Sequence, residues 1–305
     1  ELVLGWRDSF KLAGSTFSYG ITGTFSDYTA EYTKCDNPTG LIGDPYVGKK
    51  YGEIWGYKVD GLFRNDKEAA EYASRIDLST VASGYYTATG AYGKGVRGGD
   101  IKYLDLNGDN IVNGGKGTLD DPGDRRVIGN SSPRYQYGAS LNFSWYGFDV
   151  SVFMQGIGRL DWYPGADNLR FWGPYCRPYA AFVPKNFMSQ VWSEENPDAY
   201  FPRARAYTSL NSNSGTAYYT NDRYLQNLAY CRLKNLTIGY TIPRRLTSKV
   251  GIKECRIYFS GENLATWSAL KSDFLDPEQA AADSDKKANV YPWCKTYSIG
   301  LNLTF

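Results

Sequence analysis

Histidine is absent from this chain of 305 residues. Its absence removes the commonest general base, the serine–histidine catalytic triads and most zinc sites from consideration. Paired acids such as Glu194 and Glu195 are neighbours in the sequence, so their side chains diverge and do not form a general acid and base. The sequence therefore predicts a protein that is not an enzyme.

Long apolar runs are also missing, and neither sign of charge dominates. No stretch approaches the ~18 apolar residues of a transmembrane helix, which excludes helical spans but leaves membrane-spanning strands open. The net charge is +2 and no block of lysine or arginine stands out, so nothing indicates a nucleic acid partner. The five cysteines show no CxxC spacing, and an odd number cannot pair completely within the chain.

A secretion signal is missing as well. The first residues, from Glu1 to Trp6, already alternate like a strand and contain no basic segment or cleavage site. We therefore expect the sequence to begin within a longer protein.

What the sequence does contain is alternation, most clearly between residues 135 and 157. Apolar residues from Tyr135 to Trp145 alternate with small or polar ones, and the alternation resumes at Phe148 after a break at Tyr146–Gly147. A period of two places the two kinds of residue on opposite faces of a strand. Ten steps of roughly 3.3 Å, tilted by ~40°, rise about 25 Å, the height of the apolar band of outer-membrane barrels. This stretch predicts a membrane β-hairpin.

About eight such strands occur along the chain, with Tyr51–Phe63 the least regular, and their connections are short and long in turn. Short turns lie near Tyr146 and at Pro243–Gly251, and long connections at 64–132, 162–226 and 268–289. Outer-membrane barrels show this asymmetry, whereas a soluble sandwich, the alternative, has no reason to segregate loop lengths by side. In this arrangement the connection from Asp8 to Gly14 is an unusually short outer loop.

The predicted inward-facing residues are small. A closed barrel of eight strands fills its interior with side chains, which these residues are too small to do. We therefore expect the strands to belong to a larger barrel whose other strands lie upstream. The inward residues of two strands are Gly138, Ser140, Asn142 and Ser144, and Ser298, Gly300, Asn302 and Thr304.

Several blocks of the sequence are distinctive when taken together. They are Gly56–Phe63 (GYKVDGLF), Gly99–Asp109 (GDIKYLDLNGD), Asp124–Asn130 (DRRVIGN), Pro133–Tyr135 (PRY), Arg232–Tyr240 (RLKNLTIGY) and Gly261–Leu264 (GENL). In this order, and over nearly the whole chain, they resemble the carboxy-terminal barrel of SusC/RagA-like TonB-dependent outer-membrane transporters.

The resemblance implies an all-β fold of antiparallel transmembrane strands with long extracellular loops. Residues 1–305 would supply about the last eight strands of a 22-stranded barrel, without the plug domain and early strands. It further implies a Gram-negative outer membrane, a SusD-like surface lipoprotein as lid, and energy from TonB through the missing amino-terminal part. The cargo would be a glycan or, as the other option, a peptide. Phe305 fits the aromatic carboxy-terminal residue of the barrel assembly signal.

An acidic loop is the first candidate site. Asp105, Asn107, Asp109, the carbonyl of Ile111 and Asn113 occupy positions 1, 3, 5, 7 and 9 of a calcium loop. Asn110 replaces the usual glycine at position 6, and Lys116 replaces the glutamate at position 12. Asp120 or Asp121 could supply the missing carboxylate. The sequence predicts weak Ca²⁺ binding, and the alternative is a solvated turn.

An aromatic loop is the second candidate site. Flat rings offer a large rigid surface at little entropic cost, which suits stacking on sugars or contact with a lid protein. The alternative is a loop that packs on its own aromatic residues. The candidate contact residues are Trp162, Tyr163, Arg170, Phe171, Trp172, Tyr175 and Tyr179.

The leading functional hypothesis is an active importer of large nutrients, most simply oligosaccharides. The alternative, from another class, is a surface adhesin or a calcium-stabilised carbohydrate-binding β-domain. Heat-modifiable gel migration and dependence on detergent would distinguish the barrel from the adhesin.

Overall fold

A computed structural model describes residues 1–87, 95–176, 183, 185–205, 215–271, 275–282 and 291–305. The elements in chain order are β1 (Leu2–Leu12), β2 (Ser15–Ser26), β3 (Glu53–Tyr57), β4 (Val59–Leu62), α1 (Asp66–Ala73), α2 (Ser83–Thr87), β5 (Ile101–Tyr103), β6 (Arg125–Asn130), β7 (Arg134–Trp145), β8 (Phe148–Arg159), β9 (Asp161–Trp162), α3 (Leu169–Trp172), η1 (Gly173–Tyr175), η2 (Met188–Gln190), β10 (Gln226–Asn227), β11 (Tyr230–Thr241), α4 (Arg244–Thr247), η4 (Ser248–Val250), β12 (Glu254–Ser268), α5 (Pro277–Ala282) and β13 (Thr296–Thr304).

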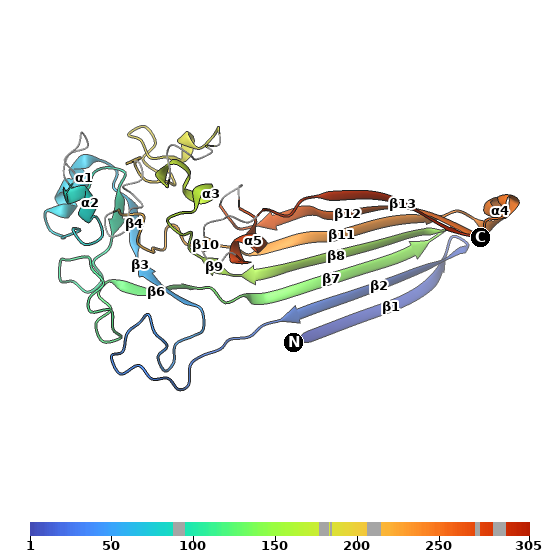
Figure 1. The fold of residues 1–305 in the computed structure, drawn as a ribbon, viewed down its shortest axis with the longest axis horizontal. Helices are drawn as coiled ribbons and strands as arrows, with labels where there is room; N and C mark the ends of the chain where they lie inside the picture. Colours follow the sequence, from blue (N-terminus) through green and yellow to red (C-terminus); the bar gives the residue numbers. More distant parts are fainter. Residues whose placement is uncertain (88–94, 177–182, 184, 206–214, 272–274, 283–290) are drawn as a thin grey trace.

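A long antiparallel sheet of seven strands forms one end of the molecule (Figure 1). Its order is β1-β2-β7-β8-β11-β12-β13, so every strand lies beside the next long strand in the chain. The predicted hairpin is confirmed, because β7 and β8 pair along their whole length with Leu141 opposite Val152. Antiparallel neighbours in chain order need no crossover connections, so the chain builds the sheet as a simple meander.

The connections segregate by length, as predicted. Three short ones lie at the end of the sheet that carries α4 and the carboxy terminus, while the long connections lie at the opposite end (Figure 1). Two of the short turns, Ala13–Gly14 and Tyr146–Gly147, have positive φ at both residues, the geometry of a tight hairpin turn. The connection near Gly14 is therefore a short turn on the same side as the other two short turns. Its prediction as an outer loop was wrong, because β1 continues to Leu12.

One of the eight expected strands lies outside this sheet. The segment 51–63 divides into β3, which pairs with β6, and β4, which pairs with β5. Its alternation is irregular, and Gly56 leaves no space for a side chain, since a Cβ there would lie 2.7 Å from the Thr220 carbonyl oxygen. With this segment in the loops, the short and long connections alternate without exception.

The apolar outer residues of the long sheet are exposed. Leu4 has 65% of its surface exposed, Leu141 38% and Ile299 83%. Such a continuous apolar face is rare on a protein surrounded by water and marks an interaction with lipid or another protein. Among the described residues, no helix has the length and apolar composition needed to cross a membrane.

The hydrophobic core lies in the long connections at the other end of the molecule, not under the sheet. The three two-stranded sheets and the helices α1 to α3 surround it (Figure 1). Its most completely buried side chains are Phe63, Leu78, Val81, Tyr85, Ile101, Tyr103, Val112, Trp172, Tyr224 and Leu228.

Candidate functional site

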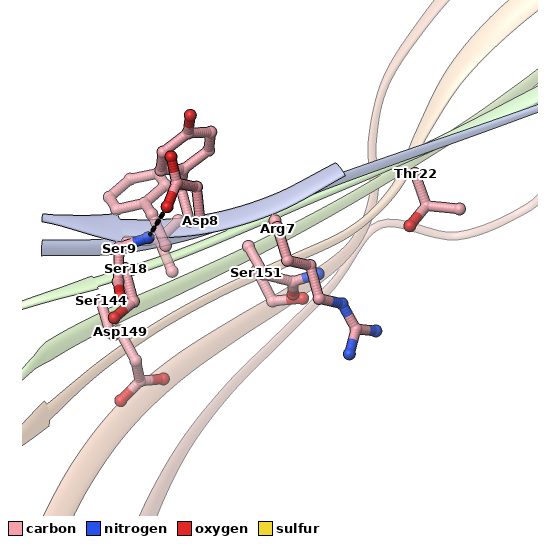
Figure 2. Close-up of a pocket in the computed structure, with 13 residues that line it drawn as sticks. Arg7, Asp8, Ser9, Ser18, Thr22, Ser144, Asp149 and Ser151 are labelled. Atoms are coloured by element: carbon pink, nitrogen blue, oxygen red, sulfur yellow. Dashed lines mark hydrogen bonds between the residues drawn. The ribbon is translucent and has the colours of Figure 1, made fainter. Parts of the chain in front are cut away.

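The inner face of the long sheet is polar and hollow. A cavity of about 740 Å³ lies against β1, β2, β7 and β8 near the end with the short turns. Figure 2 shows Arg7, Ser151 and Asp149 extending from these strands toward one side of the sheet. Many of the residues along it are short, such as Ser18, Thr22 and Ser144, and they leave space that bulkier side chains would fill.

An ion pair crosses this inner face. The Arg256 guanidinium on β12 reaches over β11 to the Asp149 carboxylate on β8, with Nε 2.9 Å from Oδ1. Gly239 on β11 makes this possible, because a Cβ there would lie 2.4 Å from Arg256 Nη2 and 2.5 Å from Asp149 Oδ1. The pair ties three strands together on the face that the alternation predicted to be polar.

A second group of charges fixes the segment of α5 to the sheet. The buried Arg232 guanidinium on β11 bonds Asp276 at 2.5 Å and Glu278 at 2.8 Å. Lys234 also bonds Glu278 at 2.8 Å and lies 4.9 Å from the centre of the Trp293 ring. Charge-assisted hydrogen bonds that are shielded from water are stronger than exposed ones. The described part of the last long connection is therefore held against β11.

A buried ion pair also joins two of the loop segments. Arg205 donates to both carboxylate oxygens of Asp100, at 2.9 and 2.6 Å, and the two side chains are 4% and 1% exposed. Burial raises the pKa of the Asp100 carboxyl to about 6, while the Arg205 charge acts in the opposite direction. The guanidinium also lies 4.1 Å from the centre of the Tyr85 ring. The pair is part of the loop core rather than a reactive site.

The predicted cation ligands form a loop that bonds its own backbone. Asp105 accepts hydrogen bonds from the amides of Gly108 and Asn110, at 2.7 and 2.9 Å. Asn107 accepts from the Asp109 amide and Asp109 from the Ile111 amide, at 3.0 and 2.8 Å. These are the local side-chain turns that aspartate and asparagine favour.

The remaining predicted ligands continue the same pattern. Asn113 accepts from the Gly115 amide at 2.6 Å, and the Ile111 carbonyl accepts from the Asn113 side chain at 3.5 Å. Asp121 lies against Gly115, where a Cβ would be 2.2 Å from its carboxylate oxygen. Within the described ranges, no three Asp, Glu, His or Cys side chains are grouped closely enough to hold a metal ion. The geometry does not add support for calcium, which stays a prediction.

The carboxylate that closes this loop is Asp124, which the sequence analysis did not consider as a ligand. It is fully buried and accepts from the Leu106 amide at 2.7 Å and from the Asn113 amide at 2.8 Å, so it joins the two arms of the loop. Asp120 and Asp121 were the candidates because they come first after Gly115. The signal that could have found Asp124 is its place directly before β6, where the strand fixes its position.

The rings of the aromatic loop are largely buried in the loop core. Trp162, Tyr163, Phe171, Trp172 and Tyr175 are between 0% and 7% exposed. Their burial favours the alternative of a loop that packs on its own aromatic residues, and contact of these rings with a lid or cargo stays a prediction. Burying these rings removes a large apolar surface from water, which lowers the free energy of the folded chain more than leaving the rings exposed would.

The packing within this core is close. The Trp172 ring lies 5.1 Å from that of Tyr224 and 4.8 Å from that of Phe171. The Tyr175 hydroxyl donates to the Pro202 carbonyl at 2.5 Å. Of the other two predicted contact residues, Arg170 is exposed, and Tyr179 lies outside the described residues.

An exposed apolar face, a hollow polar face and long connections at one end together define a wall of a membrane β-barrel. Comparison with known proteins leads to the same class. No family model matches the chain. Three TonB-dependent receptors of Formosa agariphila are similar to it: P26 is 28% identical over 68% of this chain, P3 is 26% identical over 85%, and P39 is 26% identical over 81%.

Solved structures of the RagAB peptide transporter have a similar fold. The RagAB peptide transporter gives a TM-score of 0.52 at 17% identity, over 99% of this chain. The open-open state of the RagAB peptide importer gives 0.55 at 16% identity, also over 99% of this chain. This chain spans 20% to 24% of the length of the three receptors and 28% to 29% of the two transporter chains. The comparisons confirm the resemblance to SusC/RagA-like TonB-dependent transporters and the fold class drawn from it.

Proposed function

We propose that this chain is part of the barrel of an outer-membrane importer that takes up large nutrients with energy from TonB. The observation that carries the proposal is the opposition between the two faces of the seven-stranded sheet. The outer face exposes apolar residues such as Leu4 and Ile299, and the inner face is hollow, polar and crossed by the Arg256–Asp149 ion pair. A wall of this kind separates lipid from an aqueous interior.

The two edges of the sheet support a larger barrel. Among the strands that the structure describes, β1 and β13 each pair with one neighbour, and unpaired backbone groups at a sheet edge are very costly in lipid. In the complete transporter these edges are paired with further strands. The names of the relatives, TonB-dependent receptors, support the coupling to TonB.

The end with the long connections is the outer end in this proposal, because outer-membrane barrels carry short turns on the periplasmic side. A SusD-like surface lipoprotein would cover that end. Since most of the aromatic residues expected at this contact are buried in this chain, exposed loop residues are the better candidates for contact with the lid. We propose oligosaccharides as cargo, with peptides as the alternative that the RagAB likeness favours.

Uptake by intact cells tests the function. A strain with the full-length transporter and its lid should accumulate a fluorescent oligosaccharide or, in a parallel arm, a fluorescent oligopeptide. Deleting TonB or adding a protonophore should abolish accumulation. Uptake that persists without TonB would contradict the proposal, as would a transporter that is soluble without detergent and migrates identically on gels with and without heating.

Cysteine labelling tests the orientation. The native cysteines are first replaced by serine, because Cys294 is exposed and would react. A membrane-impermeant maleimide should then label a cysteine at exposed position 120, between β5 and β6, and should not label one at position 245 in α4. The opposite labelling would reverse the topology.

A further inference from the structure

A second cavity lies among the loops, away from the sheet wall. Its volume is about 550 Å³, and it is formed where β3, the start of β6 and two aromatic segments meet the glycine-rich turn at 114–117. Tyr57, Tyr163 and Tyr219 supply flat surfaces around it, and Tyr218 is 38% exposed. The cavity also contains two cationic side chains, Lys116 and Arg125.

The glycines of the turn make room for Arg125. A Cβ at Gly114 would lie 3.1 Å from Arg125 Cζ, and one at Gly117 would lie 2.9 Å from its Nη2. The guanidinium therefore lies flat on bare backbone and donates one hydrogen bond, from Nη2 to the Gly114 carbonyl at 2.8 Å. Side chains at these two positions would push it out of the cavity.

The positive charge of Arg125 is not balanced inside the described structure. Among the described residues, no carboxylate oxygen lies within 4.0 Å of its nitrogens or of Lys116 Nζ. Asp124 precedes it directly, but the Asp124 oxygens accept from the amides of Leu106 and Asn113. The buried Nε of Arg125 has no hydrogen-bond partner. An unsatisfied, partly desolvated guanidinium is costly, and an anionic ligand would offset that cost.

Tyr57 lines the same cavity as Arg125. Burial raises the pKa of Tyr57 to about 12, with Arg125 acting in the opposite direction, so the hydroxyl stays protonated and can donate a hydrogen bond. A planar guanidinium binds carboxylate or sulfate groups through two parallel hydrogen bonds. Aromatic rings beside it provide surface for the apolar face of a sugar ring.

We propose that this cavity binds the anionic group of an acidic sugar, a carboxylate or a sulfate carried on a sugar ring. Arg125 and Lys116 bind the charge, and the tyrosines contact the ring. The inference rests on the proposed function, and it narrows the proposed cargo from oligosaccharides in general to acidic oligosaccharides.

Calorimetry on the purified full-length transporter in detergent tests the proposal. The probes are trigalacturonic acid, a sulfated galactose trisaccharide, neutral galactotriose and a triglutamate peptide. At least one acidic sugar should bind about tenfold more tightly than galactotriose, and the preference should shrink as salt is added. The two acidic sugars show whether the carboxylate or the sulfate is the preferred group.

Variants locate the binding. Arg125→Gln should remove the acidic preference, about a tenfold loss, and Arg125→Lys should retain part of it. The matched control is Arg126→Gln, because Arg126 donates to the Gly123 and Arg125 carbonyls and does not line the cavity. Unchanged heat-modifiable migration shows that each variant is folded.

Three results would overturn the proposal. They are equal binding of acidic and neutral sugars, an acidic preference that survives Arg125→Gln, and binding of triglutamate as tight as that of the sugars. Calorimetry measures binding without transport, so it tests the cavity separately from the importer function. Uptake that depends on TonB, together with no preference for acidic sugars, would refute only the cavity proposal. A preference for acidic sugars, together with uptake that does not depend on TonB, would refute only the importer function.

Discussion

Large apolar side chains are exposed on the long sheet and buried in the loop region. On the sheet, Leu141 and Ile299 are 38% and 83% exposed, whereas in the loops Trp172 is 0% exposed. Both arrangements follow from the hydrophobic effect, but the surroundings differ. The loops bury apolar surface away from water within the chain, and the sheet leaves it outside, where lipid would replace water in the proposed barrel wall. Exposure alone therefore does not show whether a residue contributes to stability.

The largest effect is expected from the buried ion pair of the loops. Arg205→Ala leaves Asp100 buried without its partner and should cost about 3–5 kcal/mol of local stability. Hydrogen exchange of the full-length protein in detergent should show faster exchange in the loops and unchanged exchange in the sheet. The double variant Arg205→Met/Asp100→Leu should recover most of the loss. If the double variant were as unstable as the single one, packing rather than the unpaired charge would be the cause.

Removing a ring from the loop core should be almost as costly. Trp172→Ala leaves a cavity against Phe171 and Tyr224 and should cost about 3–5 kcal/mol. The matched control is Arg170→Ala, two residues away and exposed. Limited proteolysis should cut the loops of the first variant faster and leave the second unchanged. Equal cutting of both would mean that Trp172 is not a core residue.

A charge placed on the outer face of the sheet tests whether that face lies against lipid. Leu141→Arg places a charge in the lipid-facing row and should cost about 2–4 kcal/mol. Ser140→Arg, on the adjacent inner-facing position, should cost far less. Folding yields in liposomes, read from heat-modifiable migration, measure both. Equal yields would refute the assignment of the two faces.

The acidic loop gives the smallest effect. Asp105→Ala with Asp109→Ala removes acceptors for three exposed backbone amides, whether or not a cation binds. Because water can replace these bonds, we expect about 0.5 kcal/mol for each. The mutant alone is therefore no test of calcium. We predict that a chelator accelerates hydrogen exchange of the Gly108 and Asn110 amides in the wild type and has no further effect in the mutant. If the chelator does not change exchange in the wild type, the loop is held by its own hydrogen-bonded turns and the calcium prediction is wrong.

Several features could be predicted from the sequence because they depend on local pattern. Alternation with a period of two determined β7, β8, β11 and the faces they present. In the turn between β7 and β8, Gly147 supplies one of the two positive φ angles that a tight hairpin needs. The distinctive blocks identified the resemblance to the transporter family. The one strand placed wrongly, 51–63, was also the least regular in its alternation.

Other features depend on contacts between residues far apart in the sequence. Nothing local distinguishes Trp172 in a core from the same residue on a contact surface, because burial depends on Tyr224, 52 positions further along the chain. Likewise, Asp124 closes the acidic loop because β6 places it there, and Arg125 lines a cavity because Gly114 and Gly117 leave the space.

The sequence by itself determined which residues alternate along each strand, since a strand's geometry is local. Only the tertiary structure decided which aromatic rings and charges meet, since long connections bring together segments whose separation in the chain carries no information about their distance in space.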